Sequence, residues 1–370
     1  MKILIVNHYA GSRRHGMEFR PYDLAIAMKK AGCEVEIVTA SYTHLRSENF
    51  DLNNKWMNEL EVNKIKYYIL KTIKYRNNGA LRLLNIIVFL LNLWCHRRFF
   101  KKKGYDCIIF SSTYPFDVYL MSALKSSNEN KQLIIWELHD LWPLSLQVLH
   151  GLRPKSLFAR VCYHAQQYAV EKSDLVISLL ENAEIYYEKL GLKPRKFIFL
   201  PLGFVEQNLI EDSIDCYNSE IEEELLKLKR INKCIIVYSG YFGEQNAIDR
   251  LMDAADKLHQ EQLHFVLIGD GPLKPLLRQK LRKNVSIFDR ISNNKLHKIL
   301  KICDISYLGG PDSELYNYGV SPNKLLDYMC AKLPVIWSYP VSSSIIETAK
   351  CGVSVTASAD GVISGIKTLV

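Results

Sequence analysis

The sequence lacks the features that mark secreted, disulfide-stabilised or metal-clustered proteins. Its nine cysteines stand singly, with no CxxC pair and no Cys/His cluster at metal-ligand spacing, which is typical of reduced thiols in a cytosol-facing protein. The N-terminus MKILIVNHYAG lacks the basic-then-apolar layout of a signal peptide, so we expect a cytoplasmic protein. No GxGxxG fingerprint is present, which argues against a dehydrogenase.

Acidic residues are scarce in the first half of the chain. The formal net charge is +9, and residues 1–190 carry 26 basic and 18 acidic side chains, whereas residues 191–370 carry 22 and 21. The surplus of positive charge in the first half predicts an anionic partner there. A length of 370 residues predicts two domains, each large enough for its own core.

Short apolar runs alternate with helical segments at the spacing of βαβ units. The predicted strands are 2–7, 34–40, 106–111, 133–137, 175–179 and 197–201 in the first half, and 234–240, 264–269, 285–288, 305–308 and 334–337 in the second. The predicted helices include 18–31, 247–260, 273–281 and one ending at 303. We therefore predict an α/β protein with two doubly wound, Rossmann-like domains facing each other across a cleft. Their bounds are 1–205 and 234–370, with an acidic linker carrying one exposed helix over 206–233.

A basic loop, NHYAGSRRHGMEFRPY, follows the first predicted strand. Its glycines bracket a basic stretch just before a helix, where backbone N–H groups and the helix dipole favour an anion. The pattern predicts an acceptor or phosphate loop, although two glycines are equally consistent with a plain loop. The residues of this predicted loop are Gly11, Ser12, Gly16, Glu18 and Arg20.

Polar residues also follow the strand 133–137. Open parallel sheets bind ligands at the carboxyl ends of their strands, so His139 and Asp140 are predicted to meet a substrate. A structural histidine that caps the strand end is the alternative.

Glycines end two strands of the second half. VYSGYFGEQNAIDRL places Gly240 and Gly243 after one strand, and VLIGDGPLKPLL places Gly269 and Gly271 after the next. Small residues there let a ligand approach the backbone closely. IGDGP alone indicates a turn, but two such strand ends in one domain favour a ligand site.

The stretch GVSPNKLLDYM, residues 319–329, is the most specific of these features. Its Ser-Pro pair is typical of a helix start, the next two N–H groups would meet a phosphate, and the lysine adds a full charge. The aspartate one turn later can accept two ribose hydroxyl hydrogen bonds, unless it only stabilises the helix dipole. The predicted residues are Ser321, Pro322, Asn323, Lys324 and Asp327.

The segment ALRLLNIIVFLLNLWCHRRFFKKK, residues 80–103, is too short and too polar in its apolar part to span a membrane. It is either a core helix with a solvated basic end or an interfacial element. In the second case two phenylalanines would enter the lipid boundary while basic residues meet anionic headgroups. The charge asymmetry favours the interfacial element. The predicted membrane residues are Arg97, Arg98, Phe99, Phe100, Lys101, Lys102 and Lys103.

These motifs, in this order, resemble the retaining glycosyltransferases of family four, which have the GT-B fold. The matching pieces are HGMEFRPYDLAIAMKKAGCEVEIVT, LPLGF, SGYFG, LIGDGP and GVSPNKLLDYMCAKLPVI, spread over nearly the whole chain. Within the family, the combination of HYAGS, HGMEFRPY, DLWP and SPNKLxDYM is most similar to bacterial amino-sugar transferases of the fucosamine type, from O-antigen and capsule synthesis.

The resemblance implies a role for individual residues. Asp327 stands at the second acid of a two-acid donor motif and would bind the ribose. Residues 321–324 would cradle the diphosphate, with Gly240 and Gly243 lining it. The base would be met by the backbone of Arg290 and Ile291, and the transferred sugar would be faced by His139 with Asp140 beside it.

The sequence departs from the family pattern in three places. Gly319 stands where the first acid is usual, and Asp312 or Glu314 could supply the missing contact. The basic residues of the segment after SGYFG are absent, so Lys324, helix N-termini and Arg20 are expected to meet the phosphate charge. The chain also ends before the long C-terminal helix that usually crosses back to the first domain.

The resemblance implies retaining transfer of an N-acetylated amino or deoxyamino sugar from a UDP-sugar in bacterial surface-polysaccharide or lipopolysaccharide synthesis. The acceptor would be an undecaprenyl-diphosphate-linked saccharide, with the protein peripheral on the cytoplasmic face of the inner membrane. Because there is no D-x-D motif, we expect backbone amides and Lys324, not a metal, to stabilise the leaving diphosphate. We expect no cofactor and no nucleic-acid partner.

Two other functions stay open at this point. A GT-B nucleotide-sugar 2-epimerase would turn over the donor without any acceptor. A non-catalytic membrane-associated partner in polysaccharide assembly would bind no nucleotide, and the missing acid at Gly319 and the short C-terminus favour it.

Overall fold

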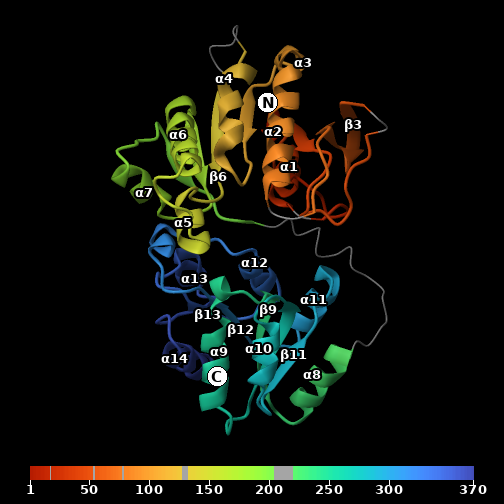
Figure 1. The fold of residues 1–370 in the computed structure, drawn as a ribbon. Helices are drawn as coiled ribbons and strands as arrows, with labels where there is room; N and C mark the ends of the chain where they lie inside the picture. Colours follow the sequence, from red (N-terminus) through yellow and green to blue (C-terminus); the bar gives the residue numbers. More distant parts are fainter. Residues whose placement is uncertain (17, 53–54, 77–78, 127–131, 204–219) are drawn as a thin grey trace. The chain divides into compact units, whose positions relative to one another are not determined.

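The computed structural model describes residues 1–16, 18–52, 55–76, 79–126, 132–203 and 220–370. The chain forms two compact units, Met1–Glu206 and Gln207–Val370, each built around its own β-sheet (Figure 1). Helices and strands alternate along both units. The prediction of two Rossmann-like α/β domains is therefore confirmed.

The sheet of the first unit has eight strands in the order β3-β4-β2-β1-β5-β6-β7-β8. All neighbours pair in parallel except β3 and β4. The register sets Val6 beside Phe110 and Phe110 beside Trp136, so β1, β5 and β6 end at one edge of the sheet. The strands are β1 (Lys2–Val6), β2 (Glu34–Ala40), β3 (Met57–Val62), β4 (Ile65–Leu70), β5 (Cys107–Phe110), β6 (Leu133–Leu138), β7 (Leu175–Ser178) and β8 (Phe197–Phe199).

The antiparallel hairpin of β3 and β4 is not among the predicted elements. Its two-residue connection, Asn63 and Lys64, has φ of +50° and +63°, a geometry that matches the right-handed twist of paired strands. The outer strand β3 is largely exposed and carries Glu59 and Glu61. Because β3 shows no apolar run, its sequence pattern does not predict a buried strand.

The first unit contains seven α-helices and one 3₁₀ helix within its described residues. The predicted helix 18–31 is present as α1 (Arg20–Lys30). The segment 80–103 forms two helices that break at His96. The helices after α1 are α2 (Ala80–Cys95), α3 (Arg97–Lys102), η1 (Pro115–Leu120), α4 (Met121–Leu124), α5 (Leu144–His150), α6 (Leu157–Lys172) and α7 (Ala183–Lys189).

The sheet of the second unit has six parallel strands in the order β11-β10-β9-β12-β13-β14. The end of β9 lies level with that of β10, where Gly240 pairs with Gly269. The strands are β9 (Cys234–Tyr241), β10 (Leu263–Asp270), β11 (Val285–Phe288), β12 (Ile305–Gly309), β13 (Val335–Ser338) and β14 (Gly352–Ser354).

Helices cover both faces of this second sheet. Leu251 of α9 and Val362 of α14 pack in one apolar cluster, whereas Leu225 of α8 and Tyr328 of α12 pack in another. The helices are α8 (Glu220–Arg230), η3 (Glu244–Asn246), α9 (Ile248–Lys257), α10 (Lys274–Gln279), α11 (Asn293–Leu300), η4 (Glu314–Tyr318), α12 (Asn323–Cys330), α13 (Ser344–Ala349) and α14 (Ala359–Leu369).

The acidic segment predicted as a linker is corrected in part. Residues 206–219 lie outside the described residues, and the rest forms α8, whose Ile221 and Leu225 are buried in the core of the second unit. The amphipathic spacing of these two residues binds the helix to the sheet. The helix is therefore a layer of the second unit and not an exposed element of a linker.

Candidate functional site

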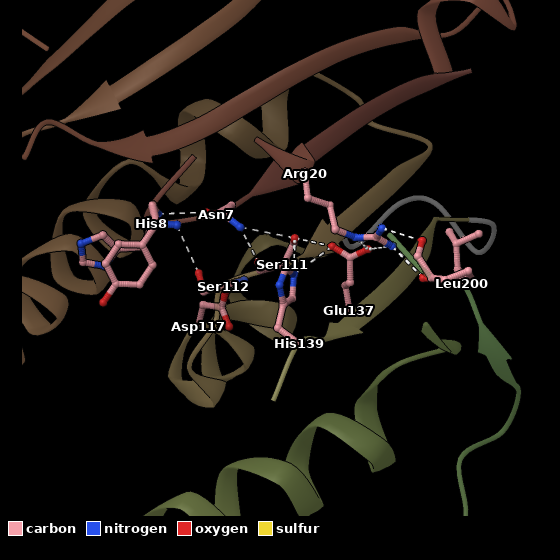
Figure 2. A network of polar contacts seen from close by, with 11 residues as sticks. Asn7, His8, Arg20, Ser111, Ser112, Asp117, Glu137, His139 and Leu200 are labelled. Atoms are coloured by element: carbon pink, nitrogen blue, oxygen red, sulfur yellow. Dashed lines mark hydrogen bonds and ion pairs between the residues drawn. The ribbon is translucent and has the colours of Figure 1, made fainter. Parts of the chain in front are cut away.

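A polar network gathers where three strands of the first unit end (Figure 2). The Asn7 side chain, following β1, donates to the carbonyl oxygen of Ser111, following β5. The Ser111 hydroxyl in turn donates to Glu137 of β6. His139 Nε2 lies 3.1 Å from Ser111 Oγ and 3.1 Å from Glu137 Oε2. The shared strand register brings these residues together, as the topology of an open parallel sheet predicts.

Arg20 completes this network from the start of α1. Its Nε donates to Glu137 Oε1 at 2.9 Å, and its two terminal nitrogens donate to the carbonyl oxygens of Pro201 and Leu200. The side chain is 5% exposed and its carboxylate partner is fully buried. The expectation that Arg20 meets a phosphate is therefore wrong, because its guanidinium is already paired inside the unit.

The ionisation states of the network follow from this pairing. Burial raises the pKa of Glu137, but the hydrogen bond from His139 and the charge of Arg20 outweigh burial and lower it to about 2. Burial lowers the pKa of His139, yet its hydrogen bond to Glu137 and the carboxylate charge hold the pKa above its usual value. The pKa of Glu18 is raised by burial, an effect that the charge of His139 opposes. The network is thus a buried and charge-balanced cluster.

Two further titratable groups lie beside this network, in Figure 2. His8 is buried, and burial with the charge of Arg46 lowers its pKa to about 3, so its ring is neutral. Burial raises the pKa of Asp117 to about 7. One oxygen of Asp117 accepts from the Ser112 N–H at 3.3 Å, and the other has no partner among the described residues.

The basic loop after β1 is folded upon itself. The N–H of Gly11 donates to the Glu18 carbonyl, and the N–H of Gly16 donates to the Ser12 carbonyl. The Ser12 hydroxyl is buried and paired with His15 Nδ1 at 2.7 Å. The N–H groups of Gly11 and Gly16 and the Ser12 hydroxyl are thus engaged within the loop. The predicted phosphate contacts of Gly11, Ser12 and Gly16 stay predictions.

Gly16 has a structural reason to be glycine. Its φ is +91°, and a Cβ there would lie 2.9 Å from the backbone nitrogen of Ser47. Either condition disfavours a side chain.

In the second unit, Lys324 lies at the end of β9. A Cβ on Gly240 would lie 2.2 Å from Lys324 Cε, so the missing side chain of the glycine makes room for the lysine stem. Lys324 Nζ donates to the Tyr238 hydroxyl at 3.0 Å and to Asn246 Oδ1 at 2.7 Å. The structure thus brings together Gly240 and Lys324, two residues that the sequence predicted as donor contacts.

The partners of the Lys324 ammonium are neutral. No carboxylate forms an ion pair with it among the described residues. Burial lowers its pKa to about 8. A buried cation without a counter-ion is costly, and an anion arriving beside it would relieve that cost.

Two other predicted glycines have packing roles at these strand ends. A Cβ on Gly269 would lie 1.8 Å from the Gly240 carbonyl oxygen, and its φ is +156°. A Cβ on Gly243 would meet the side chains of Gln245 and Tyr241 at 2.4 and 2.5 Å. Close packing therefore accounts for both glycines, and their ligand contacts stay predictions.

The helix start in GVSPNKLLDYM is one residue later than predicted. Pro322 is the N-cap of α12, and no side chain caps the helix, so Ser321 precedes it and does not cap it. Asn323 and Lys324 are its first two residues, whose N–H groups have no acceptor within a helix. Tyr328 anchors the helix to β9 by accepting the Ser239 N–H at 2.9 Å.

Asp327 lies in the second turn of α12 and faces α11. Its Oδ1 is 3.6 Å from His297 Nε2, and the carboxylate is partly exposed. The segment that leads into α11 carries Arg290, which is exposed, and Ile291, which packs against the core. The predicted ribose and base contacts thus belong to neighbouring elements of the second unit.

Gly319, where relatives usually carry an acid, has φ of +104° at the end of η4. That conformation favours glycine over any residue with a side chain. Asp312 and Glu314 just upstream are both exposed. Asp140, in the first unit, is likewise exposed directly after His139.

The predicted membrane residues divide into an inner and an outer set. Phe100 is fully buried against Tyr68, with Phe99 packed on both rings. Lys103 donates to the Tyr68 hydroxyl at 2.6 Å. The prediction that Phe100 enters lipid is wrong, because β4 offers it a tyrosine on which to pack. Arg98 and Lys102 are exposed.

Among the described residues no helix combines the length and hydrophobicity needed to cross a bilayer. No group of three or more His, Cys, Asp or Glu side chains there is placed to hold a metal ion. The expected metal independence of the reaction stays a prediction.

The sequence reasoning missed several residues of these two clusters. Glu137 carried a signal, because it is a lone acid in the apolar run LIIWEL. Ser111 and Asn7 stand at strand ends, but small polar residues are common there. Tyr238 and Asn246 come near Lys324 only through the fold, since the lysine lies 86 and 78 residues away in the chain.

Comparisons with known proteins agree with this architecture. Residues 14–206 match the family model Glycosyltransferase Family 4, and residues 233–370 match Glycosyl transferases group 1. The chain is 35% identical over 77 residues to the putative colanic acid biosynthesis glycosyl transferase WcaI of Escherichia coli K12. This similarity spans only 20% of the chain and 19% of the relative.

Solved structures extend the likeness over the whole chain. The Escherichia coli protein described as trehalose-6-phosphate, bound with UDP-2-fluoro glucose, matches with a TM-score of 0.66 at 11% identity, covering 100% of this chain and 91% of that one. Anabaena Alr3699/HepE in complex with UDP matches with a TM-score of 0.58 at 16% identity, covering 100% and 89%. At these identities the likeness is one of fold.

Proposed function

The chain belongs to Glycosyltransferase Family 4, and from that premise we propose that it transfers a sugar from a UDP-sugar to a lipid-linked saccharide in bacterial surface-polysaccharide synthesis. The similarity of one segment to a colanic acid biosynthesis transferase supports the polysaccharide context. The UDP and UDP-sugar held by two proteins of the same fold support the donor class. The sugar is proposed to be an amino or deoxyamino sugar, transferred with retention and without a metal.

The observation that carries this proposal is the partly buried ammonium of Lys324. It has two neutral partners and a pKa lowered to about 8 by burial. It lies where β9 ends and α12 begins, beside the N–H groups of the first helical turn. A diphosphate would supply the counter-charge that the lysine lacks, and the helix N-terminus would add N–H donors.

The leaving group is then stabilised by fixed positive charge. As the bond between sugar and diphosphate breaks, negative charge grows on the diphosphate oxygens, and Lys324 with the N–H groups of α12 would meet it. Asp327 would hold the ribose hydroxyls, with His297 3.6 Å away to orient the carboxylate. These roles assign the donor to the second unit.

His139 is proposed to hydrogen-bond the transferred sugar from the first unit. Its ring is held between Ser111 and Glu137, and the carboxylate raises its pKa. Glu137 is a positioning residue in this scheme, because Arg20 and His139 occupy its two oxygens.

Front-face substitution is the proposed route to retention, with the departing phosphate helping to deprotonate the acceptor. The anomeric configuration of the product, measured by NMR coupling constants, tests it. A product with the same configuration as the donor is expected, and an inverted product would remove the proposal.

The test of the donor assignment is a panel of UDP-, GDP- and dTDP-sugars scored by thermal stabilisation. A ligand at about 100 times its dissociation constant stabilises the folded state by about 2.7 kcal/mol. UDP-sugars are expected to raise the melting temperature of the natural protein and to lose that effect in Asp327→Ala. The absence of stabilisation by any nucleotide sugar would contradict the proposed function.

A further inference from the structure

Helix α2 exposes one apolar face to solvent. Leu84, Ile87, Leu91 and Trp94 are 45%, 43%, 57% and 47% exposed, and their spacing places them along one face of the helix. We call this face the α2 stripe. The inner face of α2 is apolar as well, since Ile86, Phe89 and Leu93 are buried. The α2 stripe is therefore an additional apolar face, left exposed to solvent.

Two asparagines hold the helix in this orientation. Asn85 and Asn92 are buried on the inner face. The Asn85 amide donates to the carbonyl oxygen of Ile73, and the Asn92 amide donates to those of Trp56 and Lys71, at 3.0 and 3.2 Å. Turning the leucines inward would break these bonds and leave buried carbonyl groups unpaired. The outward stripe is therefore built into the fold.

Positive charge continues the stripe at its C-terminal end. Arg97 lies over the Trp94 ring, 3.8 Å from its centroid, and donates to the Trp94 carbonyl. Arg98 and Lys102 are exposed on α3, which follows α2 directly (Figure 1). From residue 62 to residue 105 the chain carries eleven Lys and Arg residues and no Asp or Glu. The stretch of chain that carries the stripe is thus basic.

We propose that the α2 stripe with the basic end of α3 is a surface that docks on an anionic lipid bilayer. The leucines and isoleucine would enter the boundary between headgroups and acyl chains, and Trp94 would lie at headgroup level. Arg98, Lys101 and Lys102 would meet the anionic headgroups.

A second copy of this chain is the less suitable occupant. Two stripes packed face to face would bring two basic segments together without any acid to pair them, and like charges repel. An anionic lipid surface satisfies both the apolar and the charged part of the face. This inference rests on the proposed lipid-linked acceptor, which would reach the enzyme at such a surface.

The experiment is co-sedimentation of the full chain with vesicles of phosphatidylethanolamine and phosphatidylglycerol. The triple variant Leu84→Gln, Ile87→Gln, Leu91→Gln is expected to lower the bound fraction by more than about tenfold, because each apolar side chain contributes to the partition. The matched control is Ile231→Gln, Leu276→Gln, Leu281→Gln, three exposed apolar residues of the second unit, and it is expected to bind like the natural protein.

A second variant tests the charged part of the surface by replacing Arg98, Lys101 and Lys102 with Gln. It is expected to weaken binding to phosphatidylglycerol vesicles by at least about tenfold, and added salt should weaken the natural protein in the same way. Vesicles of phosphatidylcholine alone, which carry no net charge, should bind the natural protein weakly.

Several outcomes would overturn the inference. Equal vesicle binding by the stripe variant and the natural protein is one, and absence of binding by the natural protein is another. Loss of a concentration-dependent dimer in the stripe variant, with unchanged vesicle binding, would assign the face to a second copy instead. UDP-sugar thermal stabilisation, measured on the same variants, separates these results from a failure of the proposed function, since the stripe lies outside the donor residues.

Discussion

The two polar clusters of this protein balance their charge in opposite ways. In the first unit, Arg20 and His139 flank the carboxylate of Glu137, and every charge has a partner inside the fold. In the second unit, Lys324 is partly buried and has two neutral partners. The first cluster is complete as it stands, whereas the second lacks an anion.

The pKa values express this difference. Glu137 is held ionised, with its pKa lowered to about 2, because its partners outweigh burial. Lys324 has only burial acting on it, which lowers its pKa to about 8. A balanced cluster contributes to stability, but an unbalanced one is maintained at a cost that a ligand can relieve. The comparison therefore assigns positioning to the first cluster and anion binding to the second.

The largest expected effect comes from breaking the balanced cluster. Glu137→Gln leaves the Arg20 guanidinium buried without its carboxylate, which should lower the free energy of unfolding by about 3–5 kcal/mol. Urea unfolding followed by circular dichroism measures it. Glu184→Gln, at an exposed carboxylate of α7, is the control and should change stability by less than about 0.5 kcal/mol. A Glu137→Gln protein as stable as the control would show that the pairing is not what holds this region.

The next prediction concerns the unbalanced cluster. Here the substitution should not lower the free energy of unfolding, in contrast to Glu137→Gln. Lys324→Met removes a partly buried cation that has no carboxylate partner among the described residues, so the free energy of unfolding should stay the same or rise. UDP affinity should fall by about 10- to 150-fold, the equivalent of about 1.5–3 kcal/mol for a charged hydrogen-bond donor. Calorimetric titration with UDP measures the loss. Lys280→Met, an exposed lysine of the same unit, should bind as the natural protein does, and equal affinity in both variants would refute the lysine's role.

A third prediction concerns Gly240. It separates the steric effect of a side chain at this position from the effect of its positive φ. Gly240→Ala would set a Cβ 2.2 Å from Lys324 Cε at a φ of +139°. We expect a loss of about 1–3 kcal/mol in stability together with weaker UDP binding, since the lysine must move. Gly32→Ala has a positive φ of +83° but no atom within 4 Å of its Cβ, so it should lose stability and keep its affinity for UDP. Unchanged UDP affinity in Gly240→Ala would mean that the lysine's position is not critical.

The smallest effects are those of pH. Above about pH 8, Lys324 loses its proton in the free protein, and UDP affinity should fall by about tenfold over the next pH unit, a change of about 1.4 kcal/mol, and level off at the affinity of Lys324→Met. Between about 8 and the ordinary lysine pKa the unfolded chain binds more protons than the folded one, so the contribution of this lysine to stability rises with pH. UDP titrations at several pH values check it, and a Lys324→Met protein with the same pH dependence would contradict the assignment.

The balanced cluster responds at acid pH instead. The stabilising charge of Glu137 is fully present above its ordinary pKa and is lost as the pH falls through that value toward about 2. The raised pKa of His139 works in the other direction, since its contribution is present below its ordinary pKa and lost as the pH rises through the folded value. The difference in unfolding free energy between the natural protein and Glu137→Gln, measured across pH, should narrow at both ends.

Much of the fold follows from local pattern. Strands such as β1 and β9 are buried on both faces, so they appear as plain apolar runs. The exposed strand β3 has no apolar pattern that predicts a buried strand, and the sequence of α8 favours a linker because its acids outnumber its buried residues. Exposed edge elements carry weak local signals, since solvent accepts almost any polar sequence there.

The sequence predicts which residues belong to the candidate site, but not which other residues they contact. Lys324 and Gly240 were identified from strand ends and a helix start, and the fold brings them together. Arg20, in contrast, is predicted to meet phosphate charge because it is basic, lies near the start of a predicted helix and could replace the missing basic residues of the second half. Its buried position beside Glu137 could not be read from a sequence in which 117 residues separate the two.

By itself the sequence determined the alternation of strands and helices, the two units and the residues that stand at the ends of their parallel strands. Those features depend on near neighbours in the chain, where apolar periodicity and turn residues act directly. Only the tertiary structure decided which charges are paired and which side of α2 faces solvent. These depend on distant partners, such as the carbonyl groups that hold Asn85 and Asn92 inward. A local pattern contains the leucines of α2 but not the direction in which they point.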